Sequence, residues 1–283
     1  MRANKPESFI RPQPNQEEPE MFSLIVYTHM VVCIMLYCIL ASPFFLIAGI
    51  FCLLTGRPFN VVVLKFIRTF GRCMIRCWYS VYVPVRLDDF SGGADHGIFV
   101  ANHRSSSDPF LVSIIPAAGA AMAAAKGWAL HMPFFGVFAR MGGFIDVNNL
   151  TYEEIVEQTR RALSNSGTIY VFPEGTRSGS RTMAPFHSAF FRAAKELGAP
   201  LIPVAIAGNE NSPDRSFRMR PGRVIMRVLK PIPQERINSE PHFRIQRDVH
   251  RILEEETASL DREIDAWKHE RRYPFFLSSA KST

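Results

Sequence analysis

The sequence predicts an α/β fold with a mixed, largely parallel sheet flanked by helices and an N-terminal membrane-associated helical segment. From about residue 80 onward, short apolar runs alternate with amphipathic stretches, which is the pattern of strands joined by helical connections. Polar residues collect just after two of these apolar runs. Residues 23–55, by contrast, contain no Asp, Glu, Lys or Arg. Together these observations predict a membrane-associated chain whose functional residues follow the ends of strands.

The composition limits the classes of partner. The chain has 283 residues, 47% of them hydrophobic, so it can bury a sizeable core. The net charge of +7 fits an anionic membrane surface, an anionic substrate or nucleic acid. Because no nucleic-acid-binding motif is recognised, we expect no nucleic-acid partner. The five cysteines all lie in or beside apolar segments without a complete metal-ligand spacing, so we expect neither a disulfide framework nor a metal site.

The N-terminal quarter of the chain divides into a polar and an apolar part. Residues 1–22 are polar and contain several prolines, which predicts a flexible tail. The charge-free run over residues 23–55 exceeds the roughly 20 residues that a helix needs to cross a bilayer. Because Ser42 and Pro43 interrupt it, two arrangements fit: one span with an interfacial piece, or a broken hairpin within one leaflet. A buried hairpin of a soluble protein is the alternative, which the length of the run disfavours.

A basic stripe follows the apolar run. Lys65, Arg68, Arg72 and Arg76 recur every three or four residues over residues 59–79. This spacing predicts an amphipathic helix that lies against an anionic membrane surface. A solvated face on an ordinary helix is the alternative. The cluster also predicts that the following domain lies on the cytoplasmic face of the membrane.

The α/β region has clear element boundaries. Its predicted strands are residues 81–87, 97–101, 120–125, 143–147, 168–172, 201–207 and 223–228, and its predicted helices are 109–115, 133–141, 152–164, 188–197 and 241–271. Thr151 and Glu154 form a capping box at a helix start, and Gly198 marks a helix end. The chain therefore divides into a polar tail (1–22), membrane-embedded and interfacial helices (23–79), an α/β domain (80–235) and a C-terminal helix and tail (236–283).

The first polar cluster is NHRSSSD, residues 102–108, between the predicted strand 97–101 and a helix that begins at Pro109. Proline suits the first turn of a helix, and Asp108 suits its N-cap. The spacing also lets Asp108 turn back to one imidazole nitrogen of His103, which leaves the other nitrogen to accept a proton from a substrate hydroxyl. A capping aspartate beside an incidental loop histidine is the alternative.

The second polar cluster is FPEGTRS, residues 172–178, at the end of the predicted strand 168–172. Arg177 offers a planar fork of donors that suits phosphate or carboxylate, and Gly175 lets the backbone approach a ligand closely. Arg181 adds a second cation. A tight turn with an exposed arginine is the alternative.

Three segments together resemble the glycerolipid acyltransferases, in particular those of the 1-acylglycerol-3-phosphate acyltransferase type. They are Asn102-His103 with Asp108, FPEGTRS at 172–178, and IPVAI at 202–206. The stretch from Lys126 to Asp146 is similar to the second motif region of that family. The resemblance covers about residues 80–230 and depends on the order and spacing of all four segments.

The resemblance implies a membrane-bound O-acyltransferase. Such an enzyme moves a fatty acyl group from acyl-CoA or acyl-carrier protein to the free hydroxyl of a lysophospholipid, here 1-acylglycerol-3-phosphate, and makes phosphatidic acid without a cofactor. His103 is implied to be the general base and Asp108 to orient it. The residues implied to bind the substrate are Lys126, Glu174, Gly175, Thr176 and Arg177. No acyl-enzyme is needed, which agrees with the absence of a Gly-x-Ser-x-Gly motif.

Two departures from the family pattern leave the acceptor open. Val147 stands where the second motif usually closes with an arginine, and His187 replaces a lysine of the third region. Phosphate recognition then depends on Lys126, Arg177 and Arg181, or the acceptor is another lysolipid, such as a lyso-aminolipid or a zwitterionic lysophospholipid. A non-catalytic lipid-binding relative and a hydrolase that uses a serine of residues 105–107 are further alternatives.

Overall fold

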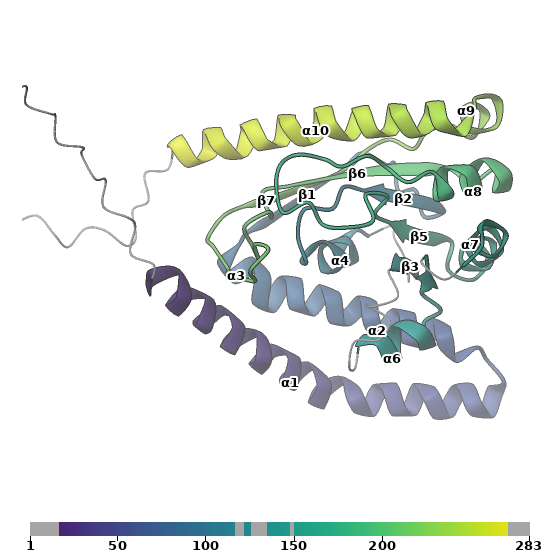
Figure 1. Ribbon diagram of the computed structural model, residues 1–283. Helices are drawn as coiled ribbons and strands as arrows, with labels where there is room; N and C mark the ends of the chain where they lie inside the picture. Colours follow the sequence, from purple (N-terminus) through teal and green to yellow (C-terminus); the bar gives the residue numbers. More distant parts are fainter. Residues whose placement is uncertain (1–16, 117–121, 126–134, 148–149, 271–283) are drawn as a thin grey trace, which may run out of the picture.

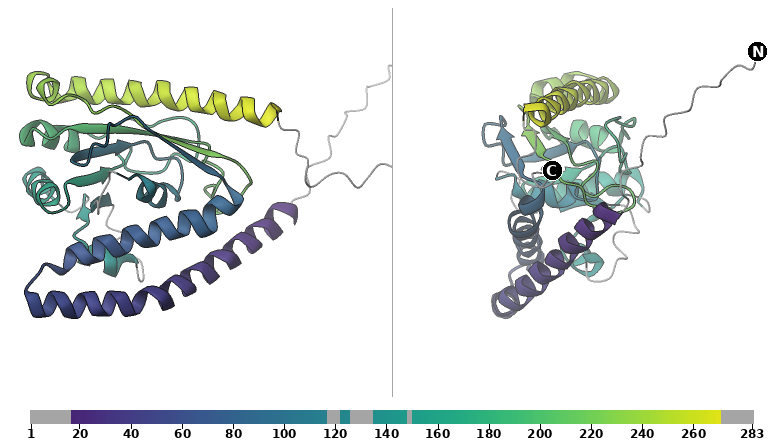
Figure 2. Two further views of the ribbon diagram at one scale, coloured as in Figure 1. Left: turned by 180° about the vertical axis from the view of Figure 1, so that it is seen from behind. Right: turned by 90° about the vertical axis from the view of Figure 1, so that its left-hand side faces the viewer.

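A central sheet lies between two helical layers in the computed structural model, which describes residues 17–116, 122–125, 135–147 and 150–270. Figure 1 shows α10 (His242–Glu270) along one side of the sheet, and α1 (Glu17–Thr55) and α2 (Phe59–Cys73) along the other. The same layers are seen from behind and end-on in Figure 2. The predicted α/β class with an N-terminal apolar helix is confirmed.

The sheet has seven strands among the described residues, in the order β1-β7-β6-β2-β5-β3-β4. They are β1 (Val85–Asp89), β2 (Gly97–Ala101), β3 (Met122–Ala125), β4 (Ile145–Asp146), β5 (Thr168–Val171), β6 (Leu201–Ala207) and β7 (Val224–Val228). All neighbouring pairs are parallel except β6 and β7, so the predicted mixed, largely parallel sheet is confirmed. Because β6, β2 and β5 are parallel neighbours, the loops that follow them leave the same edge of the sheet.

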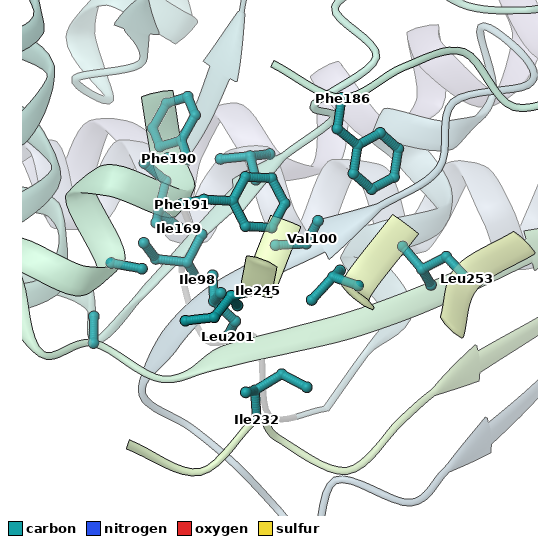
Figure 3. Packing of buried hydrophobic residues seen from close by; sticks show 14 of the residues in the cluster. Ile98, Val100, Ile169, Phe186, Phe190, Phe191, Leu201, Ile232, Ile245 and Leu253 are labelled. Atoms are coloured by element: carbon teal, nitrogen blue, oxygen red, sulfur yellow. The ribbon is translucent and has the colours of Figure 1, made fainter. Parts of the chain in front are cut away.

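The three central strands form the core. Every residue of β2, β5 and β6 is buried, as expected for apolar strands of a parallel sheet covered on both faces. On one face, α10 packs against β6 and α8 (Ala189–Leu197), and Figure 3 shows Phe191, Leu253 and Val100 in the buried cluster on this face. On the other face, Phe99 and Tyr170 stack with ring centroids 5.0 Å apart. Each fully buried side chain of this size contributes roughly 1.5–3 kcal/mol.

The long apolar helix α1, called the membrane-type helix below, begins earlier than predicted. The flexible-tail prediction is wrong for residues 17–22, which form the first turns of α1. Acidic side chains are stabilised at a helix N-terminus by the helix dipole, and Glu17, Glu18 and Glu20 lie in these turns. The predicted interruption at Ser42 and Pro43 is a position inside one continuous helix, and this helix changes direction along its length (Figure 1).

Two of the four predicted lipid-facing cations point into the protein. Arg68 donates from Nη2 to the main-chain oxygen of Pro116 at 2.7 Å, and Arg72 donates from Nε to that of Ser113 at 2.9 Å. These oxygens lie at the end of a helical segment, α4 (Asp108–Leu111) and η2 (Val112–Ile114), where carbonyls lack helical partners. The single lipid-facing stripe is therefore wrong for these two arginines, whereas the other two cations of the stripe are exposed.

The remaining elements follow the predicted pattern with shifted ends. The helix after α2 continues as a π-helical segment, η1 (Met74–Tyr79), and as α3 (Ser80–Tyr82), so the first strand begins later than predicted. The other helices are α6 (Phe135–Met141), α7 (Tyr152–Ser166) and the unpredicted α9 (Gln234–Ser239). The capping box of Thr151 and Glu154 is confirmed, and so is the helix end at Gly198, whose φ of 61° suits glycine.

Candidate active site

The candidate site lies where β2, β5 and β6 end. The loops that follow these strands carry residues 102–107, 172–179 and 208–220. Main-chain hydrogen bonds join the first two loops: Ser178 N–H donates to His103 O at 2.8 Å, and the next residue donates to the oxygen of Arg104 at 3.0 Å. The two polar clusters predicted from the sequence are thus brought together. Lys126, also predicted to bind the substrate, lies outside the described residues.

A buried carboxylate holds the histidine of the first cluster. His103 Nδ1 lies 2.8 Å from Asp108 Oδ2, and the Asp108 side chain is fully buried. The same oxygen accepts the main-chain N–H groups of Arg104 and Ser105, each at 2.8 Å. A carboxylate with these donors acts as an acceptor, so Nδ1 carries the hydrogen and Nε2 of the neutral ring offers a lone pair. The imidazole stacks on Phe172 with centroids 4.6 Å apart, and its side chain is 18% exposed.

Asp108 does not cap the helix, which corrects the predicted double role. Ser107 occupies the N-cap position of α4 without a side-chain cap hydrogen bond, and Asp108 is the first helical residue. The carboxylate instead satisfies donors of the preceding loop and of the imidazole. Pro109 lies in the first turn, as predicted.

Two asparagines fix this arrangement: Asn102, named in the first polar cluster but given no role, and Asn209, which was not predicted. Asn209 donates from Nδ2 to Asp108 Oδ1, and Asn209 is fully buried. Asn102 pairs its side-chain amide with the main chain of Ile206, at 2.9 Å from Nδ2 and 2.8 Å to Oδ1, which ties the end of β2 to β6. The signal for Asn209 was its place just after the predicted strand 201–207, but the strand order that puts it beside Asp108 could not be read from the sequence.

Glu174 lies beneath the loops and contacts main chain. Its Oε1 accepts the His103 N–H at 2.6 Å, and its Oε2 accepts the Ala184 N–H at 2.9 Å. Burial raises the pKa of this carboxyl group, and the two main-chain donors offset part of that rise. Both oxygens are thus engaged in shaping the loop. Gly175 has a φ of 68°, a conformation that suits glycine, and Thr176 is exposed beside it.

Arg177 lies over the first loop and contacts neutral groups. Its Nη1 donates to Ser106 Oγ, and its Nη2 donates to the main-chain oxygen of Arg215 at 3.3 Å. The guanidinium carbon lies 4.7 Å from the centroid of the Phe217 ring. None of the ion pairs formed among the described residues includes Arg177. Its charge is thus available to an anionic ligand.

The serines of the first loop are engaged elsewhere. Ser105 Oγ donates to the main-chain oxygen of Pro213 at 2.9 Å, and Ser106 Oγ accepts from Arg177. Within the described part of the chain, no serine hydroxyl is hydrogen-bonded to His103. A hydrolase mechanism with a serine nucleophile therefore lacks its required contact.

The C-terminal helix neutralises two further arginines. Arg104 donates from both Nη atoms to Asp261 at 2.8 and 2.9 Å. Arg181 donates from both Nη atoms to Asp265 at 2.6 and 2.8 Å and from Nε to Glu210 at 3.2 Å. The pKa of Arg181 is raised by these partners, Asp265 first. Arg181, the second cation of the predicted phosphate site, is thus engaged by carboxylates.

Comparisons with known proteins agree with this geometry. Residues 83–207, which end with β6, match the family model described as "Acyltransferase". Residues 83–207 are thus identified as an acyltransferase domain. It is 29% identical over 247 residues to the 1-acyl-sn-glycerol-3-phosphate acyltransferase of Escherichia coli, covering 85% of this chain and 96% of that protein. The Haemophilus influenzae protein of the same name is 26% identical, with 86% and 98% covered.

A solved structure has the same fold. The crystal structure of the 1-acyl-sn-glycerophosphate (LPA) acyltransferase from Thermotoga maritima superimposes with a TM-score of 0.66. The match covers 86% of this chain and 97% of that one, at 23% sequence identity. The matched domain and the named relatives together make this protein an O-acyltransferase.

Proposed function

We propose that the protein transfers a fatty acyl group from a thioester, acyl-CoA or acyl-carrier protein, to the free hydroxyl of 1-acylglycerol-3-phosphate and so makes phosphatidic acid. The observation that carries this proposal is the buried Asp108 carboxylate on Nδ1 of His103, which leaves Nε2 as a base. The names of the relatives from Escherichia coli and Haemophilus influenzae support this acceptor.

The proposed reaction needs one proton carrier and no covalent enzyme intermediate. His103 Nε2 takes the proton of the acceptor hydroxyl, while the oxygen of that hydroxyl bonds to the thioester carbonyl carbon. The tetrahedral intermediate then expels the thiolate, which receives this proton from the imidazolium and leaves as a free thiol. Asp108 stabilises the imidazolium and keeps the ring oriented. General-base assistance supplies roughly 10²–10⁴-fold, and alignment of the two substrates supplies much of the rest.

Arg177 is the proposed anchor of the acceptor phosphate. A guanidinium suits a phosphate because its planar fork of donors matches two oxygens. Gly175 and the exposed Thr176 directly precede it in the chain, and we propose that Lys126 adds a second positive charge. Glu174 serves this site by shaping the loop through its two main-chain hydrogen bonds.

We also propose that the domain lies on the cytoplasmic face of a membrane. Residues 20–55 of α1 form a helix long and apolar enough to cross a bilayer, by length and composition. Many of its large apolar side chains are exposed, which suits contact with lipid. Lys65 and Arg76, the exposed cations of the predicted stripe, favour an anionic membrane surface on that side.

An acceptor panel tests the proposal. Full-length protein in mixed micelles receives acyl-CoA or acyl-carrier protein with 1-acylglycerol-3-phosphate, a lysophosphatidylcholine or a lyso-aminolipid. We expect thiol release and phosphatidic acid by mass spectrometry with the first acceptor, and both at a rate lower by roughly 10²–10⁴-fold in the His103→Ala variant. Tight binding of the lysolipids without turnover, for every donor, would mean that the chain is a non-catalytic lipid-binding relative.

Val147 favours a second class of acceptor, a zwitterionic or amino-lysolipid. Val147, where the family pattern usually has an arginine, packs half-buried against the hydrophobic core and offers no charge. If a zwitterionic or amino-lysolipid gives a higher kcat/KM than 1-acylglycerol-3-phosphate in the same panel, the phosphate-specific assignment is wrong and the reaction class stands.

A further inference from the structure

Phe217 combines an unusual backbone with an unusual position. Its φ is 60°, and it is the sole non-glycine residue with positive φ among the described residues. A bulky side chain in this left-handed region is strained, and such strain persists only where the surroundings hold it. The side chain is also largely exposed, at 56%, so burial in the core does not explain it. What the ring contacts is the guanidinium of Arg177, 4.7 Å from the ring centroid.

A tight turn fixes this conformation. Asp214 Oδ1 accepts the main-chain N–H groups of Ser216 at 2.8 Å and Arg218 at 2.9 Å. The main chain of Asp214 also bonds to that of Phe217 and Arg218, at 3.1 and 3.0 Å. The Phe217 oxygen accepts the hydroxyl of Tyr27 on α1 at 2.6 Å. The strained residue is thus held from both sides, by its own turn and by the membrane-type helix.

The kind of contact matters for binding an anion. Arg181 and Arg104 are held by carboxylates, which neutralise them. Arg177 is instead held by an aromatic face, a hydroxyl and a carbonyl oxygen, which orient a guanidinium and leave its charge unpaired. A cation oriented in this way loses less freedom when a phosphate binds it.

We propose that Phe217 is a positioning residue for the acceptor: its ring holds Arg177 toward the phosphate of the lysolipid, and Tyr27 of α1 fixes the turn that presents the ring. This inference rests on the proposed role of Arg177. Its consequence is that docking of the membrane-type helix sets the affinity for the acceptor. The pair of His103 and Asp108 is untouched, so the effect belongs to acceptor KM and not to kcat.

Substitution of Phe217 separates this role from a structural one. Glycine adopts a φ of 60° without strain, so Phe217→Gly should keep or raise the melting temperature. The same variant should raise the KM for the acceptor about two- to five-fold, the factor that a surface cation–π contact supplies, with kcat and donor KM unchanged. Phe217→Tyr keeps a ring face and should keep the original KM. A fall in melting temperature and kcat together with the rise in KM would mean that Phe217 is only structural.

A matched pair of tyrosines tests the link to α1. Tyr27→Phe removes the hydrogen bond to Phe217 and should raise acceptor KM. The control is Tyr37→Phe, also on α1, whose hydroxyl bonds to the main-chain oxygen of Phe66 at 3.1 Å and to Thr69. The control should leave acceptor KM unchanged, and equal effects of the two variants would overturn the link.

Arg177→Ala separates the two levels of the proposal. If this variant leaves acceptor KM unchanged, the assignment of Arg177 to the acceptor is wrong. If it raises KM while Phe217→Gly does not, that assignment stands and the positioning role of Phe217 is wrong. In the double variant, loss of Phe217 should add nothing to the loss of Arg177, because the ring acts through the guanidinium.

Discussion

The side-chain amide of Asn209 donates to Oδ1 of Asp108, while His103 is bound to the other oxygen of the same carboxylate. A residue beyond the matched domain, residues 83–207, thus holds the group that orients the proposed base. Asp108 receives donors on both oxygens, which suits an ionised carboxylate kept in one position away from water.

Removal of this amide should weaken both stability and turnover. Asn209→Ala takes one hydrogen bond from a buried charged group, so we expect a loss of about 1.5–3 kcal/mol in the free energy of unfolding. Because Asp108 becomes less fixed, kcat should fall while acceptor KM holds. Urea unfolding and steady-state kinetics measure the two effects, and an unchanged kcat would show that Asn209 has no part in orienting the pair.

The two members of the proposed catalytic pair should respond differently to substitution. His103→Ala removes the base and should lower kcat by roughly 10²–10⁴-fold with little change in stability, because the side chain is partly exposed. In Asp108→Asn, the new side-chain NH2 group can face the imidazole and main-chain N–H groups, which are themselves donors. This substitution should therefore lower kcat and the free energy of unfolding together. Thermal unfolding of both variants separates these outcomes. Full activity of His103→Ala would remove the proposed mechanism.

The contact of α10 with Arg104 should be worth far more than its contact with Arg181. Asp261→Ala leaves the buried Arg104 without its two-point partner, at a cost of about 3–5 kcal/mol. Asp265→Ala affects an ion pair whose side chains are both about two-fifths exposed, so its cost should be at most about 1 kcal/mol. Equal losses in chemical denaturation would contradict this ranking.

A pH dependence is expected from Glu263, which lies between Asp261 and Asp265 on the same helix. The hydrogen bond from Arg86 lowers the pKa of Glu263 below its ordinary value of 4.5. A lowered carboxyl pKa stabilises the folded state above 4.5, and this contribution is lost as the pH falls through the lowered value. Glu263→Gln should therefore melt below the wild type at neutral pH and together with it in acid. A difference that stays constant through the acid range would show that charge is not its cause.

Sequence reasoning was accurate where local patterns decide the structure. The bounds of β2 and β6 were predicted residue for residue, because each is an unbroken apolar run that ends in polar residues. The proximity of the two polar clusters followed from the rule that ligand sites lie past strand ends. The predicted start of the first strand, at residue 81, was wrong. The apolar residues 81–83 satisfy both strand and helix patterns, and the preceding helix continues into them.

The missed side-chain contacts all join distant parts of the chain. The helical spacing of Arg68 and Arg72 predicted contact with lipid. It gave no sign of the main-chain oxygens of Ser113 and Pro116, which the two arginines bind instead. Asn209 and Asp261 reach the site from later segments, and the charge of Asp261 alone indicated a solvated helix face. No local pattern encodes these pairings.

The ion pair between Arg104 and Asp261 also has a consequence for biosynthesis. The two residues are separated by 157 positions in the chain. At about 5–20 residues per second, the ribosome makes the loop of His103 roughly 8–30 s before the carboxylate that neutralises its neighbour. The apolar α1 emerges earlier still, so the segment proposed to enter the membrane is made before the proposed reactive centre can assemble. Translation order itself thus delays this ion pair until α10 is made.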